Sequence, residues 1–356
     1  MKNRVLIALS GGVDSAVCAL LLKEKGYDCT AATMRLRAEG CAENGCCTEE
    51  DIRLARSVAE KLGIPYEVCD FSADFSSVVI DDFVRTYCEG GTPNPCIVCN
   101  RRLKFEMLFQ KGQEQGASKI ATGHYARIGY NEASGRYELL RALDPQKDQS
   151  YVLYTLTQEQ LSRTLFPLGD MSKSEVRALA AENGFENADR RDSQDICFLA
   201  DGEDYASFIE KRLGKQFESG DFVDEDGRVL GRHRGIIRYT IGQRKGLGLA
   251  LPEPLYVKEK DMAANRVILS KEEGLFSREL EADAVNLISV AEIREPMRVR
   301  AKVRYRQAEQ WATVTQLDSS RIRVVFDEPQ RAIALGQSVV LYDGDAVVGG
   351  GRIAKV

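Results

Sequence analysis

Histidine and tryptophan are scarce in this chain of 356 residues, which has two histidines, His124 and His233, and one tryptophan. Two histidines are too few for a metal centre made of several imidazoles, or for two separate histidine-based catalytic centres. No apolar run approaches the roughly 18 to 20 residues that span a bilayer. The opening Met-Lys-Asn-Arg has neither the apolar core nor the cleavage site of a signal peptide, so we expect a cytoplasmic protein without a membrane partner.

Cysteine, by contrast, occurs ten times, and in a long chain without an export signal this favours thiol chemistry or metal binding over disulfides. Four cysteines lie in apolar segments, where we expect core positions: Cys18, Cys29, Cys69 and Cys88. Three lie in the polar segment CAENGCC, where reduced loop thiols are the expectation and metal or sulfur binding the alternative: Cys41, Cys46 and Cys47. The remaining three are candidates for chemistry: Cys96, Cys99 and Cys197.

The pattern of expected secondary structure changes near residue 205. The length of the chain predicts two or three domains. Strand-like and helix-like segments alternate over the first 200 residues, which predicts an α/β fold with a parallel sheet. Glycine-rich turns and short strands follow, and from Asp283 onward apolar and polar residues alternate as in small β-barrels. We therefore expect an α/β domain over 1–203 with a helical insertion near 165–190, a small central domain over 204–274, and a barrel over 275–356.

Local patterns predict the elements of the α/β domain. The expected strands cover 5–9, 29–36, 66–71 and 119–125. The expected helices include 48–62, with Thr48 as N-cap and Gly63 after its end, and 171–184, which begins at Ser172 or Ser174.

The most informative stretch is VLIALSGGVDSAVCALLLKEKG, residues 5–26. An apolar strand ends in the turn Ser10–Ser15, and an apolar-periodic segment that reads as a helix follows as far as Gly26. Backbone N–H groups at such a helix N-terminus point outward, the helix dipole favours an anion, and glycines allow a phosphate to come close. The turn lacks the Gly-Lys-Ser/Thr ending of a Walker A loop. It therefore predicts a phosphate site of another kind, the alternative being an ordinary tight turn.

Two segments carry the candidate thiols. In TPNPCIVCN, residues 92–100, two prolines predict an extended rigid loop that ends at Cys96 and Cys99. The helix-like RRLKFEMLFQKG follows, so Cys99 is expected near a helix N-terminus with basic neighbours, a setting that favours the thiolate. In DSQDICFL, residues 192–199, Cys197 lies beside Asp195 and after Arg190-Arg191.

Basic residues are unevenly distributed, although the net charge is −5. Five cations occupy alternate positions and would share one face of a strand: Arg298, Arg300, Lys302, Arg304 and Arg306. The intervening residues are expected to face the barrel core, as is Trp311: Val299, Ala301, Val303 and Tyr305. The segment 228–245 contains basic residues and no carboxylate. Both segments suit an RNA backbone, the alternative being a solvated face or a flexible basic loop.

The turn SGGVDS resembles the loop of the PP-loop ATP pyrophosphatases, which bind ATP and transfer AMP to a substrate. Further motifs follow in the order found in the bacterial tRNA-specific 2-thiouridylases: TPNPC–x–x–CN, ATGHYAR, KDQSYVLY, D-S-x-x-I-C-F, YTIGQRKGLG and an Arg-Tyr-Arg-Gln segment. The chain resembles this family from about residue 4 to about residue 352. The resemblance implies an enzyme that converts wobble uridine (U34) of tRNA to 2-thiouridine.

The resemblance also implies a division of labour. ATP, with Mg²⁺, would adenylate O2 of the uridine. The positions that match the ATP site are the PP-loop and two further residues: Ala8, Leu9, Ser10, Gly11, Gly12, Val13, Asp14, Ser15, Met34 and Gly123. Cys197 matches the cysteine that carries a persulfide and delivers its terminal sulfur to C2. Cys99 matches the partner that would form a disulfide with Cys197.

The implied partners are tRNAs, with Glu, Gln and Lys acceptors expected, and a persulfide-carrying sulfur-relay protein or cysteine desulfurase; DNA is not expected. The positions that match tRNA contacts in the family are Asn94, Pro95, Cys96, His124, Lys147, Asp148, Gln149, Arg304, Tyr305 and Gln337. For His124, the alternative is a buried structural histidine.

One position departs from the family pattern. Well-known members have Pro-Asn-Pro-Asp, in which the aspartate assists proton transfer, whereas this chain has Cys96 there. Three thiols would then meet at one site, and a [4Fe–4S] cluster held by Cys96, Cys99 and Cys197 is an alternative to persulfide chemistry. A further alternative is a PP-loop amidase or ligase acting on a small nucleotide, and another is an RNA-binding protein that only senses ATP.

Overall fold

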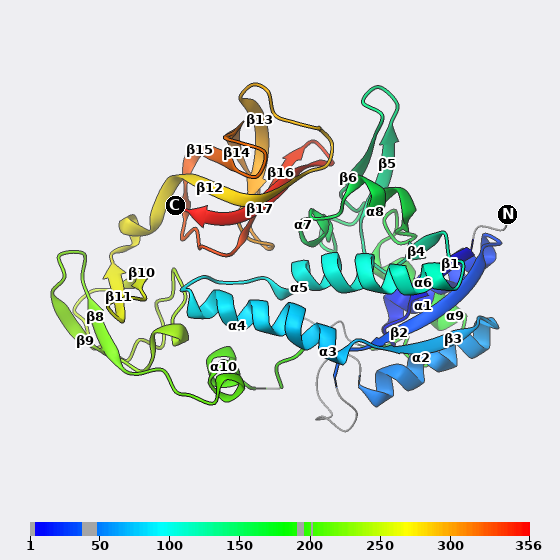
Figure 1. Ribbon diagram of the computed structural model, residues 1–356, viewed down its shortest axis with the longest axis horizontal. Helices are drawn as coiled ribbons and strands as arrows, with labels where there is room; N and C mark the ends of the chain where they lie inside the picture. Colours follow the sequence, from blue (N-terminus) through cyan, green and yellow to red (C-terminus); the bar gives the residue numbers. More distant parts are fainter. Residues whose placement is uncertain (1–3, 38–47, 191–195, 201) are drawn as a thin grey trace.

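The computed structural model describes residues 4–37, 48–190, 196–200 and 202–356. Its first part is a five-stranded parallel sheet of order β3-β2-β1-β4-β7, seen at the right of Figure 1. The strands are β1 (Arg4–Ala8), β2 (Asp28–Arg35), β3 (Tyr66–Asp70), β4 (Lys119–Ala121) and β7 (Thr164–Leu165). The central strand β1 is covered on both faces, which explains its uninterrupted apolar run.

Helices cover both faces of this sheet. Val5 and Ile7 pack toward α1 (Val13–Glu24), α2 (Glu49–Leu62) and α9 (Lys173–Glu182). Leu6 points to the other face, covered by two helical runs: α3 (Ser72–Asp74), η1 (Phe75–Ile80) and α4 (Asp81–Cys88), then α5 (Pro95–Val98), η2 (Cys99–Leu108) and α6 (Phe109–Glu114). Two short helices complete this part: α7 (Ser150–Leu153) and α8 (Gln158–Arg163).

The predicted helix starts are partly confirmed. Thr48 caps α2 through a capping box with Asp51, Gly63 ends the helix in a left-handed conformation, and Ser172 caps α9. The helix that carries the paired cysteines starts earlier than predicted. It begins at Pro95 rather than after Cys99, because proline fits the first helical position, where no N–H partner is needed.

The central part is a four-stranded sheet of order β10-β11-β8-β9, at the left of Figure 1. Its elements are α10 (Tyr205–Leu213), β8 (Gly220–Val223), β9 (Val229–His233), η3 (Ile236–Arg238), β10 (Tyr256–Asp261), β11 (Arg266–Ser270) and η4 (Glu272–Leu275). Within the residues described, no helix has the length and apolar character required to cross a bilayer.

The last part is a closed six-stranded barrel, in which β12 pairs with both β15 and β17. Its strands are β12 (Phe276–Leu287), β13 (Met297–Lys302), β14 (Gln310–Gln316), β15 (Ile322–Arg331), β16 (Ser338–Asp343) and β17 (Ala346–Lys355). A hairpin from the first part of the chain, β5 (Arg127–Asn131) and β6 (Arg136–Leu140), extends this sheet, because β6 pairs with β17 at Leu140 and Ala346.

Two expectations for the barrel are wrong. Trp311 is not in the core: the residue is 47% exposed, and the guanidinium groups of Arg298 and Arg300 lie over its ring at 5.4 and 4.7 Å from the centroid. Tyr305 is 37% exposed because β13 ends at Lys302, so the alternation does not continue to that residue. The other inward positions are confirmed as buried: Val299, Ala301 and Val303.

The row of five cations is therefore broken as well. Arg304 and Arg306 lie beyond the strand. Arg298 forms an ion pair with Asp327, Arg300 pairs with Glu309, and the ammonium group of Lys302 lies over the Tyr342 ring. Much of this positive charge is thus balanced within the barrel, which weakens the expectation of a continuous phosphate-binding row.

Candidate functional site

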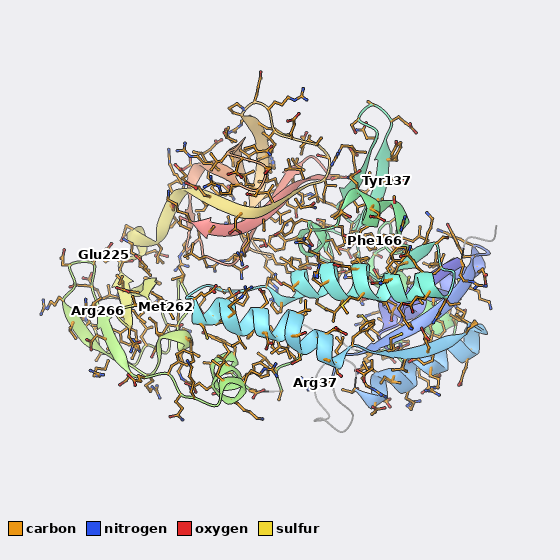
Figure 2. All side chains as sticks on the ribbon, in the orientation of Figure 1. Arg37, Tyr137, Phe166, Glu225, Met262 and Arg266 are labelled. Atoms are coloured by element: carbon orange, nitrogen blue, oxygen red, sulfur yellow. The ribbon has the colours of Figure 1, made fainter. Side chains whose placement is uncertain are left out.

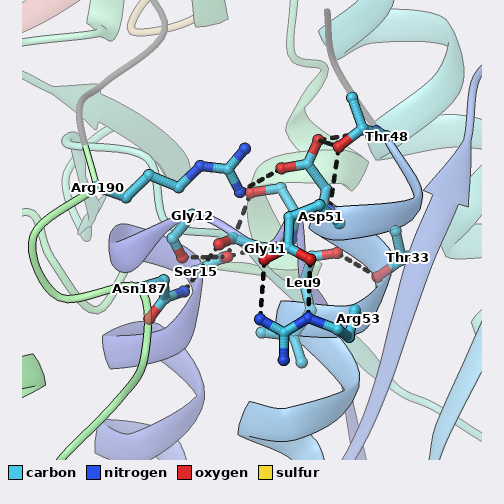
Figure 3. Close-up of polar contacts among 12 residues, drawn as sticks. Leu9, Gly11, Gly12, Ser15, Thr33, Thr48, Asp51, Arg53, Asn187 and Arg190 are labelled. Atoms are coloured by element: carbon cyan, nitrogen blue, oxygen red, sulfur yellow. Dashed lines mark hydrogen bonds and ion pairs between the residues drawn. The ribbon is translucent and has the colours of Figure 1, made fainter. Parts of the chain in front are cut away.

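The turn between β1 and α1 is closed by the side chain of Ser15. Its hydroxyl donates to the carbonyl of Gly12 at 2.9 Å and accepts from the backbone N–H of Ser10 at 3.1 Å (Figure 3). Gly11 has φ +76°, and a Cβ atom there would lie 2.4 Å from the Asp51 carbonyl oxygen. Only glycine fits this position, and the turn presents the N-terminus of α1 to an anion.

The carboxyl ends of β1, β2 and β4 meet at this turn, which is where ligands bind in open parallel sheets. Met34, near the end of β2, is 8% exposed. Gly123 follows β4, and a Cβ atom there would lie 2.7 Å from the backbone of Asp14 and 2.8 Å from the nitrogen of Ser15. The structure therefore brings Gly123 against the first turn of α1, within the predicted nucleotide site.

A lysine that the sequence analysis did not identify forms an ion pair with the phosphate loop. Lys173, the first residue of α9, places its ammonium group 2.6 Å from Asp14 Oδ1, and the Tyr125 hydroxyl donates to the same oxygen at 2.7 Å. The Lys173 side chain is 12% exposed, so its charge acts with little screening by solvent. The partners are 159 positions apart, so no local pattern could have linked them.

Cys96 and Cys99 lie one turn apart on one helical run, because α5 continues directly into η2. Cys96 is exposed and Cys99 is half-buried. The next residue, Asn100, is 2% exposed; its side chain donates to the carbonyl of Val152 and accepts from the ammonium group of Lys104. These bonds fix the helix against α7 just after the two thiols.

Cys197 is held by its neighbour. Phe198 is 4% exposed and packs edge-on against Phe83, with ring centroids 5.0 Å apart, and near Phe75 and Phe208. The guanidinium group of Arg37, labelled in Figure 2, donates to the carbonyl oxygen of Cys197 at 3.5 Å. Cys197 itself is half-buried. Asp195, which was expected beside this thiol, and the CAENGCC cysteines lie outside the described residues.

The barrel contacts the loop that leads to Cys96. Gln337 donates to the carbonyl of Thr92 at 2.9 Å, and the N–H of Thr92 donates to the carbonyl of Leu335 at 2.7 Å. Burial, and then the charge of Asp148, raise the pKa of Tyr305. The barrel edge at Leu335 and Gln337 therefore lies beside the loop that leads into α5, the thiol helix that carries Cys96.

Three models of known families match consecutive parts of the chain. They are described as tRNA methyl transferase HUP domain, over 3–201, tRNA methyl transferase PRC-barrel domain, over 206–271, and Aminomethyltransferase beta-barrel domain, over 277–353. The tRNA-specific 2-thiouridylase MnmA of Clostridioides difficile is 48% identical over 100% of this chain and 99% of its own length. That of Acetivibrio thermocellus is 49% identical over 99% of both chains.

The chain belongs to the MnmA family of tRNA-specific 2-thiouridylases. Among solved structures, a 4-thiouridine synthetase–RNA complex with bound ATP is similar at 18% identity and a TM-score of 0.37, covering 60% of this chain and 50% of that one. The predicted α/β domain with its parallel sheet, the central domain and the C-terminal barrel agree with the family models and with the structure.

In this MnmA-family chain, most predicted tRNA-contacting side chains also hold the protein together. Asp148 bonds to Ser150, Gln149 accepts from the N–H of Tyr125, and Arg304 donates to the carbonyl of Ala332. The hydroxyl of Tyr305 donates to the carbonyl of Asp148 at 3.2 Å. The segment at 147–149 is therefore tied to the barrel edge, while Asn94 is the N-cap of α5 and Pro95 is buried.

His124 is 8% exposed, in a cage formed by the rings of Phe105 and Phe166, the latter labelled in Figure 2. Its Nδ1 is 2.7 Å from the hydroxyl of Thr122. Burial, and then the charge of Lys104, hold the pKa of His124 well below 6.5, so the ring stays neutral. This environment favours the structural reading of the histidine.

The three candidate thiols do not form a metal site in this arrangement. Among the described residues, which include Cys96, Cys99 and Cys197, no three His, Cys, Asp or Glu side chains are grouped to hold a metal ion. This holds for a single ion; in a [4Fe–4S] cluster each thiolate binds a different iron atom, so that alternative stays a prediction. Mg²⁺ differs, since nucleotide-bound Mg²⁺ takes one or two carboxylates plus phosphates, and Asp14 fits that requirement.

The basic segment 228–245 is not a simple flexible loop. Arg234 and Arg238 line a cleft of about 460 Å³ with Phe217 and Tyr239, in the central part rather than at the phosphate loop. Arg238 is balanced by an ion pair with Glu210. Part of the positive charge of this segment therefore has a structural partner.

Proposed function

We propose that this chain uses ATP and a cysteine persulfide to replace O2 of the wobble uridine of tRNA by sulfur. The full-length identity of 48–49% to curated 2-thiouridylases carries the proposal. The closed loop at the carboxyl edge of the parallel sheet supports ATP binding, and the surface shared by Cys96 and the barrel supports RNA binding.

The first step is the activation of O2. Oxygen bound to C2 of uracil is a poor leaving group, so O2 attacks the α-phosphorus of ATP and pyrophosphate leaves. The N-terminus of α1 and the ammonium group of Lys173 stabilise the negative charge on the departing pyrophosphate. Mg²⁺, when bound, shields the triphosphate, and Asp14 is the loop carboxylate that would hold it.

The second step delivers the sulfur. The terminal sulfur of a persulfide on Cys197, supplied by a sulfur-relay protein or cysteine desulfurase, attacks C2, and AMP leaves with the former O2. The thiolate of Cys99 then attacks Sγ of Cys197, which breaks the S–S bond to the transferred sulfur and leaves that sulfur on C2. The product disulfide between Cys99 and Cys197 requires two electrons from an external thiol reductant before the next turnover.

Cys96 replaces the acid of the family pattern, and we assign it proton transfer at the same surface. The exposed Cys96 follows the loop at Thr92, which the barrel residue Gln337 contacts. The other tRNA contacts proposed are the positions matched in the family, with Lys147, Arg304 and Gln337 on or beside the barrel edge. The expected substrates are tRNAs with Glu, Gln and Lys acceptors.

The test is mass spectrometry of nucleosides from unmodified glutamate tRNA, after anaerobic incubation with ATP, Mg²⁺ and the protein loaded with persulfide by a cysteine desulfurase. We expect 2-thiouridine with the parent chain and none with Cys197→Ser. With Cys99→Ser, the persulfide-dependent reaction should be lost.

Two outcomes would contradict the proposal. Thiolation that survives Cys197→Ser would exclude the persulfide mechanism. Release of AMP and pyrophosphate without 2-thiouridine would identify an adenylating enzyme with another acceptor, such as a PP-loop amidase or ligase.

A further inference from the structure

The segment between α9 and Cys197 contacts the phosphate loop directly. Asn187 is 2% exposed, and its side-chain nitrogen donates to the carbonyl oxygen of Gly11 at 2.8 Å. Because a carbonyl oxygen only accepts hydrogen bonds, the amide nitrogen of Asn187 must face it. Figure 3 shows Asn187 reaching Gly11 and Arg190 reaching Asp51 from the same segment.

The bond fixes the orientation of one peptide group. The carbonyl of Gly11 and the N–H of Gly12 belong to the same planar trans peptide, so they point in opposite directions. Holding the oxygen toward Asn187 turns the N–H of Gly12 to the other side. No described residue accepts a hydrogen bond from that N–H, which stands just before the first turn of α1.

A glycine peptide needs such an anchor, because residues without Cβ atoms on either side rotate with little steric resistance. Side contacts restrict Gly11 further: the backbone of Asp51 lies against it, and the carboxylate of Asp51 forms an ion pair with Arg190 at 2.5 Å. The N–H of Arg190 in turn donates to the carbonyl of Asn187 at 3.1 Å. Gly11 is therefore enclosed by α2 on one side and the 187–190 turn on the other.

In the described part of the chain, the side chain of Asn187 makes no hydrogen bond other than the one to Gly11. Its side-chain oxygen is buried and has no hydrogen-bond partner there. A buried unpaired oxygen destabilises the fold, so an apolar residue would suit packing better. The asparagine is explained by its bond to Gly11.

We propose that Asn187 is a positioning residue for ATP: it holds the Gly11–Gly12 peptide so that the N–H of Gly12 faces the phosphates. The inference rests on the proposed function, because it assumes that ATP occupies the loop. Asn187 lies outside the SGGVDS motif, and we expect it to raise the affinity for the phosphates of ATP without changing the affinity for the nucleoside.

The experiment measures binding of a non-hydrolysable ATP analogue and of adenosine to the full chain by calorimetry, together with KM for ATP and kcat for thiolation. Asn187→Leu removes the donor, and Asn187→Asp sets a carboxylate against the Gly11 oxygen. The control is Asn183→Leu, since Asn183 bonds only within its own helix, to the carbonyl of Leu179. Thermal melting of each variant reports folding.

We expect Asn187→Leu to weaken the ATP analogue about tenfold, because a hydrogen bond to a charged phosphate is lost, with adenosine affinity unchanged. Asn187→Asp should weaken binding of the analogue further. For both Asn187 variants, KM for ATP should rise, while kcat at saturating ATP should stay within about twofold of the parent value. Asn183→Leu should match the parent chain. Equal losses for ATP and adenosine, or no loss, would overturn the inference alone. A parent chain that binds no ATP would overturn the proposed function as well.

Discussion

The side chain of Gln337 donates a hydrogen bond to the carbonyl oxygen of Thr92 at 2.9 Å, joining the C-terminal barrel to the loop before Cys96. The two residues are 245 positions apart in the chain. The barrel therefore helps to hold the loop that leads into α5, the helix that carries Cys96.

Replacing Gln337 by Leu should lower kcat for thiolation about tenfold, because one interdomain bond is lost and the thiol helix is less well placed. ATP affinity should not change, since the phosphate loop is not involved. Gln316→Leu is the matched control, because Gln316 bonds only within the barrel. Single-turnover thiolation and calorimetry with an ATP analogue measure the two quantities; equal thiolation by the two variants would refute the prediction.

Replacing Lys173 by Met should weaken the ATP analogue by at least about tenfold. The substitution removes a cation near the phosphates and leaves the Asp14 carboxylate without its ion-pair partner. Lys111→Met is the control, since Lys111 pairs with Glu114 on the exposed surface of α6. Calorimetry at two salt concentrations checks this; affinity equal to that of the parent chain would show that Lys173 acts only within the fold.

Phe198→Leu should lower the free energy of unfolding by about 1 to 2 kcal/mol and also slow thiolation, because the ring both fills the core and anchors Cys197. Phe75→Leu removes a similar volume from the same aromatic cluster, but Phe75 belongs to η1 and is not adjacent to Cys197 in the chain. Urea denaturation should give similar losses for the two variants. If thiolation falls equally in both, the anchoring role of Phe198 is wrong.

Burial of His124 predicts a pH dependence of stability. Its pKa is lower in the folded protein than the usual 6.5, so the unfolded chain binds the extra proton first as pH falls. Stability from this group is complete above pH 6.5 and declines below it, by up to about 1.4 kcal/mol per pH unit. His124→Gln should flatten urea-unfolding stability against pH in this window. An unchanged slope would mean that the ring has the same pKa in the folded and the unfolded chain.

The cysteines should differ widely in alkylation. In the reduced protein, N-ethylmaleimide should modify the exposed Cys96 first and the half-buried Cys99 and Cys197 more slowly. Cys18 should react only after unfolding, because burial raises its pKa, and Cys69 should also resist, since burial and the Glu67 carboxylate raise its pKa to about 12. Peptide mass spectrometry over time gives the order; early modification of Cys18 would contradict the structure.

Local chemistry made much of the fold predictable. The phosphate turn, the Thr48 cap and the buried alternation at Val299 and Ala301 each depend on residues close together in the chain, where sterics and hydrogen bonding act directly. The start of α5 at Pro95 was misjudged because a proline fits both an extended loop and a first helical turn.

Long-range contacts were not predictable in the same way. The ion pair of Asp14 with Lys173 and the bond of Asn187 to Gly11 join residues far apart, and no periodicity encodes them. Trp311 was placed in the core on its apolar character, but two guanidinium groups cover its ring at the surface. These positions therefore depend on tertiary contacts, which residue composition does not reveal.

The pairing of β6 with β17 has a consequence for synthesis of the chain. The hairpin at 127–140 leaves the ribosome long before residues 346–355, so the edge of β6 that pairs with β17 has no partner until those residues are made. An unpaired strand edge invites wrong partners, including the hairpin of another nascent chain. Removing residues 346–356 would therefore harm more than the barrel, because β6, which is made early, would never receive its partner strand.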